Sequence, residues 1–396
     1  MEETAIPILE LGIVFLAAAV LGFISRRVGL PAVIGYLMVG LVGFQLLPEG
    51  SRPDEEFVRL LADVGVVLLL FEVGIELDVG RLRREHRSLL LASPLQIITS
   101  TLLAGIALTV LGQPLEVALV LGLCVAMSSS VVVVNITRSV TRRTNKVTEM
   151  SLLGWSLLRD LTGVIVGAIV LAFWNAEERD PVEAMIGLVL FFLMAAMAAR
   201  LFPLVLARLR HYHDLFLLVS IASGLIGAGI GAVVFGIPLA LAAFVAGLVI
   251  ADSPMAGEAR RRLLPFRDVF AVLFFVSVGS LLQPEALFGG LEWVFIFIGL
   301  MLVFKTAIVY LYSRIGGLER PSQIATGLSQ LGEFSFVLVS LVFVAGDVSP
   351  ELYAGLLATI TVTIGASAVA VRLPMNGWIR GSEEHHEHAA SSPSSI

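Results

Sequence analysis

Residues 215–251 read LFLLVSIASGLIGAGIGAVVFGIPLALAAFVAGLVIA and contain no charged side chain. One helix of this length, at 1.5 Å per residue, would be about 56 Å long, whereas the hydrocarbon core of a bilayer is about 30 Å thick. Gly236 and Pro238 lie inside the stretch, and both residue types interrupt helices. The stretch therefore predicts two membrane crossings joined by a turn at 235–238.

The whole chain has the same apolar character. Apolar residues make up 57% of its 396 residues and charged residues only 15%, whereas soluble domains carry about 25% charged residues. This composition excludes a soluble protein, a disordered chain and a coiled coil. Cys124 is the single cysteine, so no internal disulfide and no zinc site built on paired thiols is expected.

Apolar stretches of about 20 residues, the length of one helical crossing, follow one another along the chain. The predicted fold class is therefore an all-α polytopic membrane protein. Glu2 and Glu3 stand where a cleavable signal peptide would carry basic residues, so none is expected. We predict thirteen crossings, at 6–24, 31–47, 57–77, 88–112, 115–137, 148–174, 182–207, 214–233, 237–252, 268–283, 289–313, 321–346 and 351–371.

The basic residues predict the orientation, because cytoplasmic loops collect Lys and Arg. With the N-terminus outside, the inner segments hold 20 of the 26 basic residues, and the outer segments hold two, Arg52 and Arg179. The outer loops are acidic, for example at 54–56 and 177–178. The predicted topology is thirteen helices with the N-terminus outside and the C-terminus in the cytoplasm.

Three short motifs return later in the chain at nearly one offset. They indicate a duplicated unit, although Gly- and Leu-rich helices that look alike by chance are the alternative. The repeated helices are seven apart, an odd number, so the two copies are predicted to be inverted. Inverted repeats of broken helices around a site near the midplane are typical of secondary transporters. The motifs are 29–42 with 236–249 at offset 207, 69–74 with 274–279 at offset 205, and 122–123 with 327–328 at offset 205.

Arg159 and Asp160 form an ionisable pair about twelve residues into the stretch 148–174, near the predicted bilayer centre. Charged groups at this depth cost about 2.5–3.5 kcal/mol on insertion scales, so each is a functional candidate. An aspartate there can exchange a proton for a cation, because desolvation favours the neutral form and a bound cation offsets the charge. The alternative is a structural ion pair with Arg159 or Arg200.

Lys305 lies well inside the stretch 289–313, in a chain with 24 arginines and two lysines. Burial can neutralise a lysine, whereas an arginine stays charged. We expect a buried Lys305 to face Asp160 and to hold the empty site as an ion pair that opens when a cation arrives. A lysine that snorkels to the membrane surface is the alternative.

Two polar clusters predict interrupted helices. Ser128, Ser129 and Ser130 point in three directions around one helix, so they do not form one packing face. In the second copy, SQLGEF at 329–334 carries the carboxylate of Glu333 beside a glycine. Unwound segments use such residues, because freed carbonyls and half-helix ends can then coordinate an ion. Small-residue packing is the alternative for the serines, and Glu333 either pairs with a cationic group or titrates.

Other charged positions are expected to be structural. Glu72 and Glu76 are predicted to end a helix at the cytoplasmic surface. Arg59 and Asp63 are predicted to form an ordinary i,i+4 helix pair. The segment 381–396, rich in Ser, Glu, His, Ala and Pro, is expected to be a solvated tail.

Taken together, these residues resemble the cation:proton antiporter superfamily, in particular its second branch, which includes the glutathione-gated potassium efflux transporters. The resemblance covers residues 5–374. It is carried by LFEVGIEL at 70–77, the serine cluster at 128–130, the pair 159–160, FVSVG at 275–279, Lys305 and QLGEF at 330–334.

The resemblance implies two six-helix repeats, helices 1–6 and 8–13, and a homodimer in which a core moves against a scaffold in an elevator-type motion. It also implies that the fifth and twelfth helices are discontinuous and cross beside Asp160. The expected divisions are scaffold and dimerisation helices at 1–77 and 214–283, core helices at 88–174 and 289–371, a linker helix at 182–207, and a disordered cytoplasmic tail at 372–396.

The activity implied by the resemblance is exchange of a monovalent cation for H⁺ across a bacterial inner membrane, with potassium favoured over sodium. The chain is then a transporter and not an enzyme, and no cofactor, resident metal or nucleic acid is expected. Besides membrane lipid and a second copy, a cytosolic regulatory domain or subunit is an expected partner. The ion-binding and proton-exchange residues are Asp160, Ser128, Ser129 and Ser130, and the charge-balancing residues are Lys305, Arg159, Glu333 and Gln330.

Arg159 departs from the superfamily pattern, in which Asp, Asn, Gln or Glu usually precedes the ion-binding aspartate. The guanidinium either points away from the site, roughly 100° round the helix, or occupies the place of the cation. The second arrangement leaves two alternatives open. One is a proton-coupled carrier of an anionic solute with Arg159 as its ligand, and the other is a non-transporting or channel-like protein with a fixed Arg159–Asp160 pair.

Overall fold

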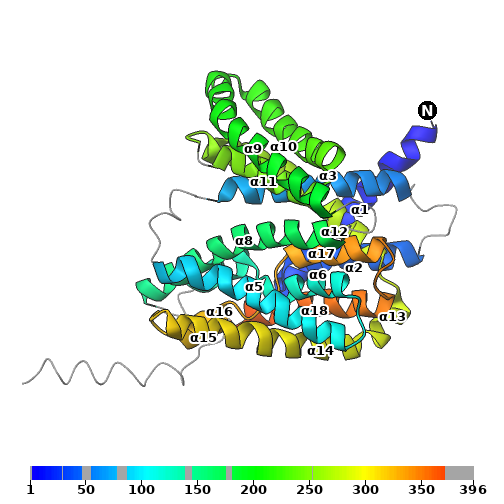
Figure 1. Cartoon of the computed structure of the whole chain (residues 1–396). Helices are drawn as coiled ribbons and strands as arrows, with labels where there is room; N and C mark the ends of the chain where they lie inside the picture. The colour runs from blue at the N-terminus through cyan, green and yellow to red at the C-terminus, as the bar shows by residue number, and fades with distance from the viewer. Residues whose placement is uncertain are drawn as a thin grey trace, which may run out of the picture.

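The computed structural model describes residues 2–28, 30–46, 55–77, 87–138, 145–174, 181–251 and 253–370. All regular elements within these ranges are helices, which confirms the predicted all-α class (Figure 1). In chain order they are α1 (Glu2–Val28), α2 (Ala32–Leu46), α3 (Glu55–Glu76), α5 (Arg87–Val110), α6 (Leu115–Ala126), α7 (Ser130–Arg138), α8 (Lys146–Trp174), α9 (Pro181–Leu209), α10 (His213–Phe235), α11 (Leu239–Ala251), α12 (Ala256–Ser280), α13 (Pro284–Gly289), α14 (Leu291–Met301), the π-helical turn η3 (Leu302–Thr306), α15 (Ala307–Ile315), α16 (Pro321–Gly327), α17 (Phe334–Val344) and α18 (Pro350–Ala370).

Seven helical segments of the described ranges are long and apolar enough to cross a membrane. They lie in α1, α5, α8, α9, α10, α12 and the continuous helix formed by α14, η3 and α15. Four shorter apolar segments lie in α2, α6, α11 and α17, of which α6 and α17 are parts of interrupted helices. The number of crossings therefore stays a prediction, because several of the thirteen expected stretches are short or divided.

The turn in the uncharged stretch 215–251 has the predicted place. α10 ends at Phe235, and Gly236 adopts a left-handed conformation with φ 67°. Its backbone N–H donates to the carbonyl of Ala232 at 3.1 Å. Glycine tolerates positive φ without a steric penalty, and Pro238 then precedes α11.

Glycines bring the helices of the first half against those of the second. A β-carbon at Gly40 in α2 would overlap the main chain of α12 around Gly279, and one at Gly279 would overlap α2. In the same way, β-carbons at Gly74 in α3 and Gly247 in α11 would each overlap the main chain of the other helix. Gly40 and Gly247 are equivalent in the predicted repeat, as are Gly74 and Gly279. The same close glycine contact therefore occurs twice, once between α2 and α12 and once between α11 and α3, with the two repeat copies exchanged.

Two groups of helices surround the candidate site. In the first group, α3 packs on α11 and α12, and α12 packs on α2. In the second group, α5 packs on α6 and α8, α14 packs on α18, and α17 packs on α6 and α18. In Figure 1, α9, α10 and α11 lie at one edge of the molecule and α14, α15 and α16 at the opposite edge, with α8, α12 and α17 between them.

The predicted helix end at Glu76 is confirmed, whereas the predicted start of the tenth helix and the predicted exposure of the Glu72 side chain were both wrong. α12 begins at Ala256, well before the predicted residue 268. Arg260 and Arg267 lie on this helix and donate to the Glu72 carboxylate of α3 at 2.5 and 2.7 Å. The Glu72 side chain is 1% exposed, so it is a buried ion-pair partner and does not lie at the surface. α12 extends to Ala256 because carboxylates of α3 neutralise Arg260 and Arg267. Without these ion pairs the two arginines would favour a solvated loop.

Two further predictions fall outside the described residues. The side chain of Arg59 is not among them, so its pairing with Asp63 stays a prediction. The tail from residue 371 onward also lies outside them.

Candidate ion-binding site

The serine cluster lies at an interruption between α6 and α7. α6 ends at Ala126, and α7 begins at Ser130. Met127 has extended backbone angles, φ −76° and ψ 147°, although its N–H still donates to the carbonyl of Leu123 at 3.0 Å. Its carbonyl oxygen is therefore free of the helical ladder and can bind another donor or a cation.

A second interruption separates α16 from α17. α16 ends at Gly327 and α17 begins at Phe334, so 328–333 is the segment that joins them. This segment contains Gln330 and Glu333, as the sequence predicts. Ser335, at the start of α17, donates through Oγ to the carbonyl of Cys124 in α6 at 2.9 Å.

The two interruptions lie in contact with each other. Ser128 Oγ donates to the carbonyl of Leu328 at 2.8 Å, and Gln330 Nε2 donates to the carbonyl of Ser129 at 3.4 Å. A β-carbon at Gly332 would lie 2.7 Å from the carbonyl oxygen of Ser128. Only a glycine allows the main chains to approach this closely, so Gly332 fixes the crossing.

Lys305 joins the two interruptions through its ammonium group. The side chain is fully buried and lies on η3, a π-helical turn of the kind that recurs at functional sites. Its Nζ donates to the carbonyl of Met127 at 2.6 Å and to the carbonyl of Gln330 at 2.5 Å. One carbonyl from each interruption thus binds a single buried monovalent cation, the ammonium of Lys305.

Arg159 and Asp160 form the buried ion pair of α8. Nη2 of Arg159 donates to Asp160 Oδ1 at 3.0 Å, and Nε donates to the same oxygen at 3.3 Å. Nη2 also donates to Ser156 Oγ at 3.0 Å. Arg159 and Asp160 are 0% and 4% exposed, so the pair lies out of contact with bulk water.

Two polar atoms in this region lack a partner among the described residues. They are Nη1 of Arg159, a cationic donor, and Oε1 of Gln330, a neutral acceptor. Buried polar atoms are nearly always satisfied in native proteins. A donor and an acceptor left open here indicate a place for a bound ion or water.

The expected ion pair of Lys305 with Asp160 is not formed in the described part of the chain. Arg159 is adjacent to Asp160 and folds back onto its carboxylate, so Lys305 turns to the freed carbonyls. Arg200 is exposed on α9 and is not the partner either. Of the two arrangements open for Arg159, the structure has the one in which the guanidinium binds the Asp160 carboxylate, at the place expected for the cation.

The remaining predicted residues divide into two sets. Ser129 lies at the crossing, where its Oγ accepts from the N–H of Val132 at 3.4 Å, and Ser130 is the first residue of α7. Glu333 does not join Lys305 or the Arg159–Asp160 pair through any contact within the described residues. It lines a small cavity on the other side of α17, together with Thr361 and apolar side chains.

Sequence reasoning missed a polar network behind the first interruption. Gln96 Nε2 donates to the carbonyl of Ala126 at 3.4 Å and to Ser100 Oγ at 3.2 Å. Trp155 Nε1 donates to Gln96 Oε1 at 3.4 Å. The signal in the sequence was an uncharged glutamine inside an apolar stretch, at the depth where α6 ends. This network holds the end of α6 in place beside the ion pair.

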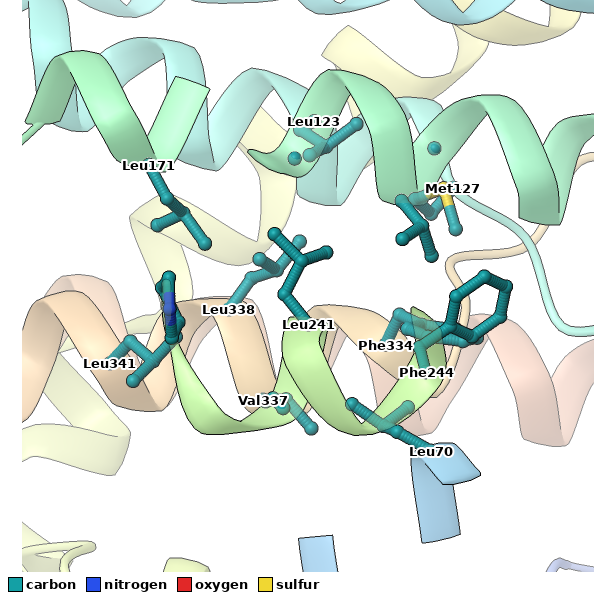
Figure 2. A pocket seen from close by; sticks show the side chains of 15 residues that line it. Leu70, Leu123, Met127, Leu171, Leu241, Phe244, Phe334, Val337, Leu338 and Leu341 are labelled. Atoms are coloured by element: carbon teal, nitrogen blue, oxygen red, sulfur yellow. The ribbon is translucent and has the colours of Figure 1, made fainter. Parts of the chain in front are cut away.

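A small apolar cavity lies between α11 and α3 on one side and α6, α8 and α17 on the other. Figure 2 shows side chains from these helices pointing into the cavity. Met127 and Phe334, which flank the two interruptions, also line it. The cavity offers no polar ligand, so an ion at the crossing is closed off on this side. The labelled lining residues are Leu70, Leu123, Met127, Leu171, Leu241, Phe244, Phe334, Val337, Leu338 and Leu341.

An all-helical protein with membrane-length helices, in which two interrupted helices cross at buried ionisable groups, belongs to the class of ion transporters of the membrane. Comparison with known proteins identifies the family within this class. Residues 13–375 match the transmembrane region of the sodium/hydrogen exchanger family. The chain belongs to this family, and hence to the cation:proton antiporter superfamily, and is an integral multi-pass membrane protein.

Individual relatives agree with this assignment. The chain is 31% identical over 340 residues to YbaL of Escherichia coli (strain K12), to which cation/proton antiport has been ascribed. This match covers 82% of the chain and 60% of YbaL. The chain is also 31% identical over 335 residues to the iron transporter MagA of Paramagnetospirillum magneticum, covering 82% of the chain and 76% of MagA.

A solved structure has the same fold. The sodium proton antiporter MjNhaP1 of Methanocaldococcus jannaschii superimposes with a TM-score of 0.71 at 16% identity. The match covers 93% of this chain and 96% of that one. At this identity the likeness establishes the fold and not the transported ion.

Proposed function

We propose that the chain exchanges a monovalent cation for H⁺, with potassium favoured over sodium. The observation that carries this proposal is the binding of the Lys305 ammonium by Met127 O and Gln330 O, one carbonyl from each interruption. Carbonyl oxygens also replace the hydration shell of potassium in selective channels. A pair of carbonyls that binds a tethered ammonium has the chemistry needed for a free cation of the same charge.

The cation would bind beside Asp160, with oxygens of the serine cluster and Gln330 Oε1 completing its shell. Asp160 then binds either the cation or a proton, because each of them neutralises the buried carboxylate. In the described arrangement Arg159 and Lys305 take the place of the cargo, so this arrangement corresponds to the ion-free state. Cation binding requires that Arg159 release Asp160.

The architecture that goes with this function is also a proposal. It comprises thirteen crossings in two inverted repeats, a homodimer, an N-terminus outside, and an elevator motion of the core against the scaffold. The exchanged glycine contacts of α2 with α12 and of α3 with α11 support the repeat. The apolar cavity between the two groups of helices supports a movable boundary there.

A second candidate function is a proton-coupled carrier of an anionic solute. The observation in its favour is Nη1 of Arg159, a buried cationic donor without a partner among the described residues. In that case Arg159 would bind the anion, and Asp160 would return the proton.

Transport in proteoliposomes separates the two candidates. A pH gradient is set across the membrane, and K⁺, Na⁺ or an organic anion is added separately while a pH-sensitive dye reports the gradient. We expect K⁺ to dissipate the gradient most effectively, and Asp160→Asn to abolish this response. Asp214→Asn, at an exposed aspartate of α10, is the matched control and retains it. Dissipation by the anion alone would establish the second candidate and contradict the first.

A further inference from the structure

Glu333 is a membrane-embedded carboxylate that the proposed ion site does not use. It is the residue immediately before α17, so it belongs to the same interruption as Gln330. The side chain is half-buried and makes no hydrogen bond or ion pair with any part of the chain that the structure describes. It lines a cavity whose other lining residues are Pro31, Val33, Ile34, Phe336, Thr361 and Ile364.

Among the described residues, none acts as a dedicated counter-ion for Glu333. The side chains of α2 and α18 that line its cavity are apolar, apart from the hydroxyl of Thr361. The charged groups that act on it through space are Arg267 of α12, Asp160 of α8 and Glu72 of α3. Arg267 already binds Glu72 and the neighbouring Asp268. An ionised carboxylate is costly in such surroundings, so a bound proton stabilises this position.

The charges at the crossing link Glu333 to the ion site. Arg159 and Asp160 form an ion pair there, and the amino group of Lys305 lies between the carbonyls of the two interruptions. The charge of Asp160 opposes ionisation of Glu333. A cation that displaces Arg159 from Asp160 adds one positive charge to this region, and the added charge favours loss of a proton from Glu333. Binding of a cation at Asp160 thus promotes proton release from Glu333, as antiport requires.

We propose that Glu333 is a second proton-carrying group, so that each cation exchanges for one proton more than Asp160 alone returns. This inference rests on the proposed antiport function. Glu333 immediately precedes α17 and shares its cavity with Pro31, Val33 and Ile34 at the start of α2. A carboxylate that moves with α17 past these apolar side chains does so in its neutral form, and it takes up or loses its proton where water reaches it.

The test compares the balance point of wild type with that of Glu333→Gln in proteoliposomes. The balance point is the pH gradient at which a fixed potassium gradient drives no net flux. The membrane potential is held at zero by a permeant ion other than K⁺ or H⁺ at equal concentration on both sides. Because the pH dependence is set by the number of protons exchanged, we expect the variant to need about twice the pH gradient of wild type. Glu351→Gln, at an exposed carboxylate of α18, is the matched control and balances like wild type.

Equal balance points for wild type and Glu333→Gln would overturn the inference while leaving antiport intact. Absence of any pH-driven potassium flux in wild type would instead remove the proposed function itself. If Glu333→Gln folds but does not transport, labelling by dicyclohexylcarbodiimide decides, because this apolar reagent attacks protonated carboxyls within the membrane. Peptide mass spectrometry is expected to find the label on Glu333 in wild type, and failure to label Glu333 would overturn the inference.

Discussion

At the scale of single residues, two buried basic side chains lie at the candidate site, and one of them, Arg159, departs from the pattern of the superfamily. Arg159 binds the carboxylate of Asp160, on which the proposed exchange depends, and Lys305 binds the carbonyls of the two interruptions. Both side chains are fully buried, and in the proposed cycle each takes the place of a transported cation. Removal of either side chain is therefore expected to favour K⁺ binding, and removal of Lys305 is also expected to destabilise the protein.

Replacing Arg159 with Gln is expected to raise the apparent affinity for K⁺. A charged hydrogen-bonded pair contributes roughly 1.5–3 kcal/mol, so removal of this competitor corresponds to about a tenfold or greater decrease in the half-saturating concentration. The measurement is potassium-dependent dissipation of a pH gradient in proteoliposomes. Loss of cation exchange together with loss of anion uptake would show that Arg159 is a required ligand, contrary to this account.

Replacing Lys305 with Met is expected to destabilise the protein, because the carbonyls of Met127 and Gln330 lose their donor. Each unsatisfied buried polar group costs about 1–3 kcal/mol. Thermal unfolding in detergent measures the effect, and added K⁺ is expected to raise the unfolding temperature of this variant more than that of wild type. Lys146→Met, at the exposed N-terminus of α8, is the control. An equal response to K⁺ in wild type and Lys305→Met would argue against a cation position at these carbonyls.

Sequence reasoning identified the ionisable residues of the site better than it identified their partners. Asp160, Lys305 and Gln330 stood out because polar groups are rare at membrane depth. The ligands of Lys305 are main-chain carbonyls, which every residue type carries, so no sequence signal marks them. The pairing of Asp160 was mispredicted because Arg159 folds back along its own helix, a side-chain conformation that spacing does not fix.

At the scale of helices, the crossing of the two interruptions positions the site. Polar and small residues at 127–130 and 328–333 predicted both interruptions, because freed carbonyls need such neighbours in a membrane. The early start of α12 was not predictable in this way. It depends on Glu72 of α3, nearly 190 residues away from Arg260, and only the fold brings the two together.

Replacing Gly332 with Ala is expected to separate the interruptions and to reduce transport strongly. The new β-carbon would lie 2.7 Å from Ser128 O, so the main chains must move apart. Overpacking of this kind costs about 1–3 kcal/mol. Gly299→Ala is the control, because no atom lies within 4 Å of a β-carbon at that position in α14. Wild-type transport rates in Gly332→Ala would show that the close approach is not needed.

At the scale of the whole molecule, the boundary between the two groups of helices is apolar where α11 faces α17. Composition and charge distribution were enough to predict an all-helical membrane protein, and three short motifs were enough to predict a duplication. The close contacts that join the halves could not be predicted, since glycine positions alone do not say which helices meet. In the same way, only the structure shows that glycines such as Gly163 and Gly167 of α8 line the apolar cavity.

Linking the two groups of helices is expected to stop transport. Leu241 of α11 and Leu338 of α17 both point into the apolar cavity (Figure 2). In the variant Leu241→Cys with Leu338→Cys, a short cleavable bifunctional thiol reagent is expected to abolish potassium-driven proton flux, and its cleavage is expected to restore the flux. The two single-cysteine variants are the controls. Full transport by the cross-linked double variant would contradict a relative motion at this boundary.

In the proposed mechanism a cation and a proton compete for one buried site, so cation binding is expected to release protons. Purified protein in weakly buffered detergent solution is titrated with K⁺ at constant ionic strength, with choline as the replaced cation, while the pH is recorded. The account predicts saturable proton release from wild type, less release from Asp160→Asn, and none with choline alone. Potassium binding that raises the unfolding temperature of wild type without releasing protons would contradict it.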